Sequence, residues 1–94
     1  MDRIAVRLLI RGRVQGVGYR WWARIEARRL GLDGWVRNRV DGSVELIAAG
    51  PAEALAELEE ICRHGPRWAQ VTAVDRSGAT DANIPPGFDE RPTV

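Results

Sequence analysis

The sequence predicts an α+β fold in which two helices cover one face of an antiparallel β-sheet. Two observations support this prediction. Stretches of alternating apolar and polar residues are typical of half-buried strands, and two other stretches place apolar residues at helical spacing. These stretches follow one another as strand, helix, strand, strand, helix, strand within residues 4–76. At 94 residues we expect one domain over residues 1–94, with a modest hydrophobic core.

The first strand is predicted over residues 4–15, with apolar side chains on one face and arginines on the other. The apolar face comprises Ile4, Val6, Leu8 and Ile10. The first helix is predicted over residues 21–30, which contain no glycine or proline. Its inward face repeats at Ala23, Ala27 and Leu30, and Gly31 is a typical residue for the end of a helix.

A β-hairpin is predicted over residues 34–49, because Asp41-Gly42 tolerates the positive φ angles of a tight turn. The pattern leaves open which face of the hairpin is buried. A second helix is predicted from Pro51 to about residue 63. Its inward face is Leu55, Leu58 and Cys62, widened by Ala54 and Ile61.

The last predicted strand runs from Trp68 to about residue 76, after the helix stop at Gly65-Pro66. Val71 and Val74 are out of step, which predicts either a β-bulge or a strand with apolar contacts on both faces. Residues 77–94 contain three prolines and little periodicity. We expect an irregular tail there, pinned by Ile84 or Phe88.

The element order βαββαβ predicts the ferredoxin-like arrangement. Two βαβ-like halves with right-handed crossovers give a four-stranded antiparallel sheet, with both helices on one face. This fold carries many functions, so the function has to be inferred from a site.

The charge distribution indicates an anionic ligand. All fourteen basic residues are arginines. Residues 1–47 have a net charge of +5 and residues 48–94 a net charge of −4, within a total of +1. The positive half favours an anion, whereas so small a total does not indicate general binding to nucleic acid or membranes.

Other function classes are disfavoured by what the sequence contains. One cysteine, Cys62, and one histidine, His64, are too few for a disulfide or for a metal centre. The N-terminus lacks the pattern of a signal peptide, and no apolar run has the length of a membrane span. We therefore expect a cytoplasmic protein without a metal centre, and we also expect a monomer.

The candidate binding site is the stretch of residues 12–20, which joins the first strand to the first helix through Gly12, Gly16 and Gly18. Glycine allows backbone N–H groups to converge on one point, and a helix start adds partial positive charge there. The chain has no lysine, which excludes a Walker A loop, and the glycine spacing differs from the dinucleotide-binding fingerprint. We infer a nest of N–H donors closed by Arg20, whose planar fork suits two phosphate oxygens.

Five sequence segments together resemble the acylphosphatase family. The resemblance extends from about residue 6 to residue 74 and rests on residues 12–20, Leu30-Gly31-Leu32, Gly34-Trp35-Val36-Arg37-Asn38, Asp41-Gly42-Ser43-Val44-Glu45 and Gly65-Pro66. It implies a ferredoxin-like fold and hydrolysis of carboxyl–phosphate anhydrides without metal or cofactor. By motif position it also implies catalytic roles for Arg20 and Asn38.

The C-terminus departs from the family pattern. Members of the family usually finish with a short apolar strand, whereas here Phe88 is followed by Asp89-Glu90-Arg91-Pro92. Proline removes a hydrogen-bond donor and discourages strand extension. The sequence therefore leaves open whether a short fifth strand forms.

The chemistry of an acyl phosphate suits a sparse site. Its leaving group is a carboxylate with a pKa of about 4, so it departs without a general acid. Phosphoryl transfer depends mainly on positioning and charge stabilisation. We expect the phosphoryl group to be held by Gln15, Gly16, Val17, Gly18, Tyr19 and Arg20. We expect Asn38 to orient the attacking water, and the phosphate itself to accept the water's proton.

Two alternative functions come from other protein classes. Ferredoxin-like domains with aromatic and arginine side chains on the open sheet face also bind single-stranded RNA by stacking. Here the four tryptophans are expected in the core and at its rim, and no aromatic run typical of such domains is present. The second alternative is a regulatory or carbamoyl-phosphate-handling domain, because acylphosphatase-like modules also occur inside larger proteins that mature hydrogenases. The length of 94 residues favours a free-standing enzyme instead.

Overall fold

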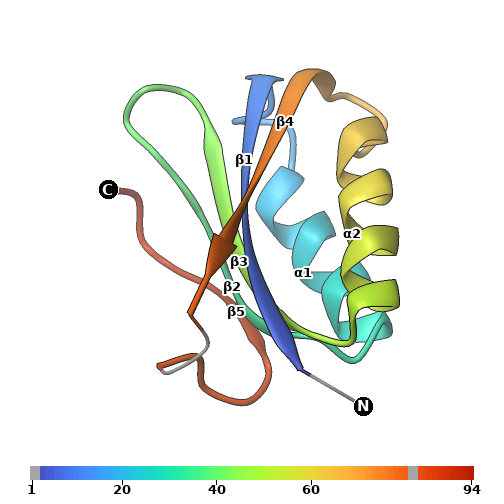
Figure 1. Cartoon of the computed structure of the whole chain (residues 1–94). Coiled ribbons are helices and arrows are strands. Elements are labelled where there is room, and N and C mark those ends of the chain that lie inside the picture. Colours follow the sequence, from blue (N-terminus) through green and yellow to red (C-terminus); the bar gives the residue numbers. More distant parts are fainter. Residues whose placement is uncertain (1–2, 81–82) are drawn as a thin grey trace.

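The computed structural model describes residues 3–80 and 83–94 and shows a two-layer molecule, with both helices packed on one face of a sheet (Figure 1). Residues 1–2, at the N-terminus, and residues 81–82, in the expected tail, lie outside the described residues. The elements are β1 (Ile4–Arg13), α1 (Tyr19–Arg29), β2 (Asp33–Asn38), β3 (Val44–Gly50), α2 (Ala52–His64), β4 (Gln70–Ala79) and β5 (Phe88–Glu90). The predicted ferredoxin-like βαββαβ order is confirmed.

The sheet has the strand order β4-β1-β3-β2-β5. β1 pairs antiparallel with β3 and β4, and β2 pairs antiparallel with β3. β5 pairs with β2 in parallel, so the sheet is mixed rather than purely antiparallel. The short fifth strand therefore forms.

The expectation of an irregular tail from residue 77 onward is wrong at both ends of that segment. β4 continues to Ala79, and the chain returns at Phe88, whose side chain is fully buried. Pro92 does not prevent further pairing, because neighbouring residues supply the donors. The N–H of Arg91 donates to the carbonyl of Val36, and that of Val94 to the carbonyl of Asn38.

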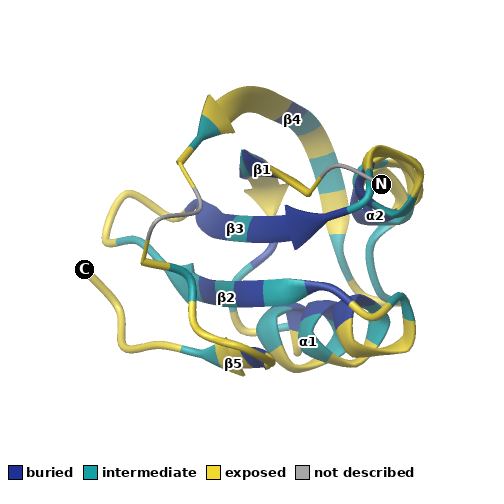
Figure 2. Ribbon diagram, turned by 60° about the horizontal axis from the view of Figure 1, so that its bottom comes forward, coloured by how far each residue is buried: buried dark blue, intermediate teal, exposed yellow. Residues whose placement is uncertain are grey.

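The hydrophobic core lies between the sheet and the two helices (Figure 2). The hairpin face that the sequence left open is now assigned. Val36 pairs with Leu46 and both are buried, whereas Trp35 pairs with Ile47 and both are half-buried. The predicted inward face of α2 is confirmed, since Leu55, Leu58 and Cys62 are its buried residues.

A β-bulge explains the pattern in β4. Arg11 pairs with Ala73, but Gly12 pairs with Val71, so one residue of β4 is extra and Val74 turns into the core. Gly12 has φ +124°, and a Cβ atom there would overlap the backbone of Gln70. The first glycine of the motif is thus required by the close approach of β1 and β4.

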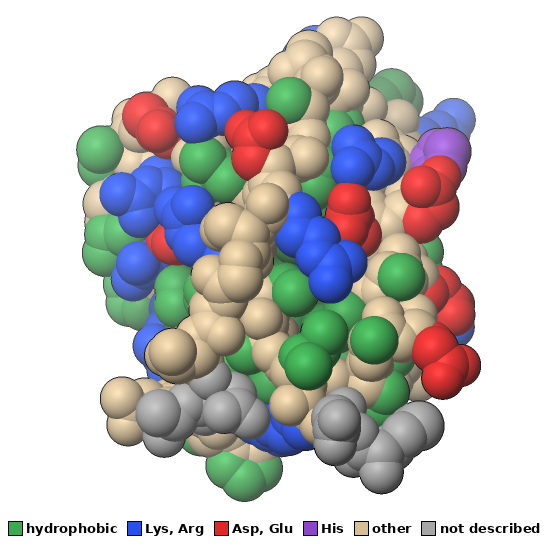
Figure 3. All heavy atoms as spheres, in the orientation of Figure 1, with side chains coloured by type: hydrophobic (Ala, Val, Ile, Leu, Met, Phe, Trp, Pro, Cys, Tyr) green, Lys and Arg blue, Asp and Glu red, His purple; other side chains and the backbone are tan. Residues whose placement is uncertain are grey.

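The open face of the sheet carries a compact ionic cluster around Glu45. The Glu45 side chain is 7% exposed and accepts hydrogen bonds from Arg7 at 2.7 Å, Arg37 at 2.8 Å and Arg39 at 2.9 Å. Burial alone would raise the pKa of this carboxyl, but the arginine hydrogen bonds outweigh burial and lower its pKa to about 2. Figure 3 shows basic and acidic side chains interleaved on the side of the molecule away from the helices.

Candidate active site

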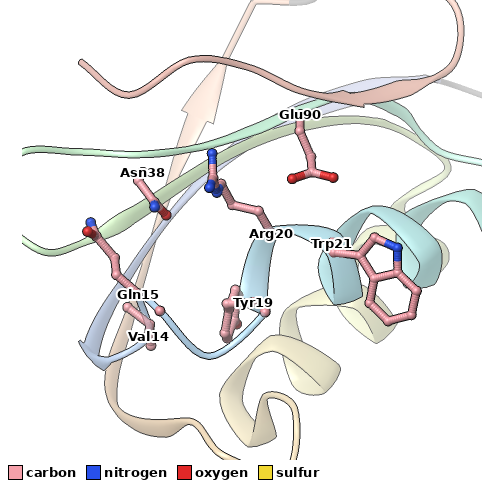
Figure 4. Close-up of a pocket in the computed structure, with 9 residues that line it drawn as sticks. Val14, Gln15, Tyr19, Arg20, Trp21, Asn38 and Glu90 are labelled. Carbon is pink, nitrogen blue, oxygen red and sulfur yellow. The ribbon is translucent and has the colours of Figure 1, made fainter.

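A pocket of about 160 Å³ opens where α1 begins, beside the end of β2 (Figure 4). Its lining includes Gln15, Gly16, Gly18, Tyr19 and Arg20 from the loop and the helix start, together with Trp21, Asn38 and Glu90. The fold therefore brings Arg20 and Asn38, eighteen positions apart in the sequence, to one cavity. It is the same cavity that the glycine loop borders.

The glycine loop exposes a set of backbone donors. Gly16 and Gly18 have φ angles of +74° and +80°, and a Cβ atom at either position would meet open space. Conformation, not room, is therefore the reason for glycine here. The first hydrogen bond of α1 runs from the Trp22 N–H to the Gly18 carbonyl.

Within the described part of the chain, none of the backbone N–H groups of residues 15–21 donates a hydrogen bond to a backbone carbonyl. Donors left unpaired at a helix start, together with the positive end of the helix dipole, are features that favour an anion.

Arg20 is the cation of this site. Among residues 3–80 and 83–94, Arg20 makes no ion pair, whereas the arginines one and two turns further along α1 do. Arg24 lies 3.5 Å from Glu90, and Arg28 lies 3.2 Å from Asp89. The guanidinium of Arg20 is therefore not engaged in an ion pair with the described residues at the pocket, which suits an anionic ligand.

Gln15 connects the loop to the β2–β3 hairpin. Its side-chain Nε2 donates to the carbonyl of Arg39 at 2.7 Å and to that of Ser43 at 2.8 Å. The amide nitrogen is thus engaged within the fold, whereas the backbone N–H of Gln15 donates to no backbone carbonyl of the described residues. The side chain fixes the loop relative to the strand that carries Asn38.

The side chains of Val17 and Tyr19 anchor the loop on the hydrophobic core. Val17 packs against the core and does not line the pocket. Tyr19 is 1% exposed, and its hydroxyl donates to the carbonyl of Cys62 at 2.7 Å. Burial raises the pKa of the Tyr19 phenol, so this side chain stays neutral and anchors the loop on the core.

Asn38 is the last residue of β2, paired in register with Val44. No hydrogen bond of its side-chain amide is formed with the part of the chain that the structure describes. Figure 4 shows this amide beside the guanidinium of Arg20, on the opposite side of the pocket from the helix start. An amide in this place can donate to and accept from one small molecule beside the anion site.

Three lining residues were not among the predicted site residues: Val14, Trp21 and Glu90. Trp21 was expected at the core or its rim, and it is 57% exposed at the pocket edge. Glu90 comes from β5, within the segment expected to be irregular, and it reaches the pocket because it pairs in register with Val36. No local sequence signal reveals a parallel pairing of this kind.

The described residues, 3–80 and 83–94, contain no cluster of three His, Cys, Asp or Glu side chains placed to hold a metal ion. In the same ranges, no helix is both long and apolar enough to cross a membrane. Cys62 is buried, and burial raises the pKa of its thiol to about 12. It is therefore an unreactive core residue.

The fold and the pocket define a class of small α+β protein with a cavity between a helix start and an arginine that makes no ion pair with the described residues. A sequence model of the Acylphosphatase family matches residues 6–89. The chain is 54% identical to the acylphosphatase of Nitrobacter hamburgensis over 100% of both chains. It is 48% identical to that of Rhizorhabdus wittichii, over 99% of this chain and 93% of the relative.

Among solved structures, the acylphosphatase from Bacillus subtilis superposes with a TM-score of 0.89 at 35% identity, covering 94% of this chain and 98% of the other. The chain belongs to the acylphosphatase family. The predicted resemblance is confirmed, and family membership favours hydrolysis over the RNA-binding alternative.

Proposed function

We propose that the protein hydrolyses the carboxyl–phosphate bond of acyl phosphates in the pocket between the glycine loop and Asn38, giving a carboxylate and inorganic phosphate. The activity itself follows from membership of the acylphosphatase family. The observation that best supports the location is that one cavity brings together Asn38, an arginine without an ion pair and backbone N–H groups without a backbone acceptor, all judged over the described residues.

The phosphoryl group binds at the loop in this proposal. Its oxygens accept hydrogen bonds from the backbone N–H groups of residues 15–19 and from the guanidinium of Arg20. These donors are already held in place by the Gln15 and Tyr19 contacts. Fixed donors are stronger stabilisers of developing charge than groups that must reorganise.

In this proposal the side-chain carbonyl oxygen of Asn38 accepts a hydrogen bond from the attacking water. This contact directs the oxygen of the water toward phosphorus. The P–O bond to the acyl group breaks as the bond to water forms. The leaving carboxylate has a conjugate acid pKa of about 4, so it departs unprotonated. One proton of the water moves to a phosphoryl oxygen and the other stays on the attacking oxygen, so the products are the carboxylate and dihydrogen phosphate.

The expected partners and setting complete the proposal. The substrate is a small acyl phosphate, and inorganic phosphate occupies the loop as product. The enzyme works as a cytoplasmic monomer, without metal, nucleic acid or membrane. An RNA titration with salt-dependent binding, combined with no hydrolysis of an acyl phosphate, would reverse this assignment.

The test is hydrolysis of benzoyl phosphate by the wild type, Arg20→Ala and Asn38→Ala, each with and without a chelator. Both variants should remain folded and lose at least ~100-fold in rate, the scale of removing one preorganised electrostatic contact. Arg29→Ala is a matched control on the same helix, because Arg29 pairs with Glu26 and Glu57 at the surface. Chelation should change nothing, and full activity of Arg20→Ala would contradict the assignment.

A further inference from the structure

The pocket contains a carboxylate that binding of a phosphoryl dianion does not need. Glu90 lines it together with Arg20, Trp21 and Asn38. In Figure 4 its side chain descends from β5 toward the space between Arg20 and Trp21. A negative group at the edge of an anion site opposes anionic ligands, so its position has a consequence for what binds.

The backbone of β5 determines where this carboxylate points. Phe88 and Glu90 are two residues apart in a strand, so their side chains lie on the same face. Phe88 is fully buried, toward α1 and the core, and Glu90 therefore also faces α1. Asp89, between them, is exposed, and its carboxylate contacts Arg28 of α1 instead of lining the pocket.

The charge of Glu90 is only partly compensated. Its carboxylate has one ion-pair partner among the described residues, Arg24 at 3.5 Å, and its side chain is 30% exposed. Arg28, one turn further, is held more closely, with its Nε 2.8 Å from the Phe88 carbonyl and its Nη2 3.2 Å from Asp89. Glu90 thus presents a negative charge to the pocket while leaving Arg20 unpaired.

The two ends of an acyl phosphate meet different walls of this pocket. If the phosphoryl group lies at the glycine loop and Arg20, the acyl group has to extend toward the rim formed by Trp21 and Glu90. Trp21 offers a flat apolar surface to that group, and Glu90 offers a negative charge. A second negative charge on the acyl group would be repelled, and a positive one attracted.

We propose that Glu90 is a specificity-determining residue that directs the enzyme toward acyl phosphates whose acyl group is uncharged or carries an amine, and against those with an anionic acyl group. This inference rests on the proposed location of the active site. It concerns substrate choice only, and the reaction itself needs no contribution from Glu90.

The test compares kcat/KM for three substrates: benzoyl phosphate, 4-carboxybenzoyl phosphate and 4-(aminomethyl)benzoyl phosphate. The wild type should prefer the neutral and ammonium substrates over the carboxylate. In Glu90→Gln the ratio of the 4-carboxybenzoyl to the benzoyl value should rise about tenfold, as expected for one partly screened charge interaction. The advantage of the ammonium substrate should fall.

Ratios separate this role from a general effect on phosphate binding. Any change in affinity for the phosphoryl group alters all three substrates alike and cancels in the ratio. Asp89→Asn is the matched control, because it removes a neighbouring acid that is exposed and does not line the pocket, and its ratios should equal those of the wild type. If Glu90→Gln folds poorly, Glu90→Val removes the same charge and introduces valine, which is a good strand former.

Unchanged ratios in both Glu90 variants would overturn the proposal, because a purely structural ion pair with Arg24 would lower all three values together. Failure of the wild type to hydrolyse benzoyl phosphate at all would instead contradict the proposed function. The two failures are therefore distinguishable in the same experiment.

Discussion

Replacing Gln15 by leucine tests whether the loop is held in place by the hairpin. The change removes two hydrogen bonds, to the carbonyls of Arg39 and Ser43. Both carbonyls keep a backbone donor, since the Gly42 N–H reaches Arg39 and the Arg39 N–H reaches Ser43. The loss is therefore about 1 kcal/mol per bond and about 2 kcal/mol in total, without a further penalty for unpaired buried groups.

For a chain of this size, 2 kcal/mol corresponds to a fall in Tm of roughly 10 °C. Activity should fall as well, because the hydrogen bonds set the distance between the loop and Asn38. A displacement of about 1 Å in a positioned group can cost up to ~100-fold in rate, so we expect a loss of at least about tenfold in kcat/KM for benzoyl phosphate.

The assay is thermal unfolding followed by circular dichroism, together with steady-state hydrolysis measured well below the variant's Tm. Gln70→Leu is the matched control, because Gln70 is exposed at the start of β4. A Gln15→Leu enzyme as stable and as active as Gln70→Leu would refute the anchoring role.

Three other changes test the fold around the site. Glu45→Gln should destabilise the protein by about 3 kcal/mol at pH 7, because the pKa falls from 4.5 unfolded to about 2 folded and each unit is worth about 1.4 kcal/mol. This stabilisation is present above pH 4.5 and is lost as pH falls toward 2. The difference in unfolding free energy between the wild type and Glu45→Gln, measured by urea titration, should therefore be smaller at about pH 3 than at pH 7. The exposed variant Glu57→Gln serves as the control. Phe88→Ala should cost about 3–5 kcal/mol in the same titration, since the side chain is fully buried. Gly18→Ala should cost about 1–2 kcal/mol for its left-handed φ. Gly78→Ala, which has open space and no positive φ, should cost less.

If the stability lost in Glu45→Gln were smaller at pH 7 than at pH 3, the role of Glu45 would be contradicted. A carboxyl whose pKa is lowered in the folded state contributes more to stability at pH 7 than at pH 3. A Phe88→Ala variant with wild-type stability would show that β5 is not part of the cooperative fold. Equal costs at Gly18 and Gly78 would mean that the loop conformation places no demand on glycine.

The sequence predicted those parts of the fold that are periodic. In β1 and α2, burial repeats at two and at about 3.6 residues, so local spacing was enough to find Leu8 and Leu55 in the core. Boundaries were less accurate: α1 begins at Tyr19 rather than near residue 21, because Gly18 ends the loop and the helix starts immediately after it.

The parts that could not be predicted depend on contacts between distant segments. β5 forms because Phe88 is buried and its neighbours pair in parallel with β2, and nothing in a segment rich in proline and charge reveals that partner. Glu90 reaches the pocket for the same reason. The hydrogen bonds of Gln15 to the hairpin were also hidden, since sequence spacing does not say which carbonyls will face a side-chain amide.

The most direct test of the proposed division of roles is the dissociation constant for inorganic phosphate, measured by calorimetry in the wild type and in the Arg20→Ala and Asn38→Ala variants. Arg20→Ala should bind phosphate about 10–100-fold more weakly, since a charge-assisted hydrogen bond contributes about 1.5–3 kcal/mol. Asn38→Ala should keep the affinity of the wild type, because its role is to orient water. Wild-type phosphate affinity in Arg20→Ala would contradict the claim that the loop and this arginine hold the phosphoryl group.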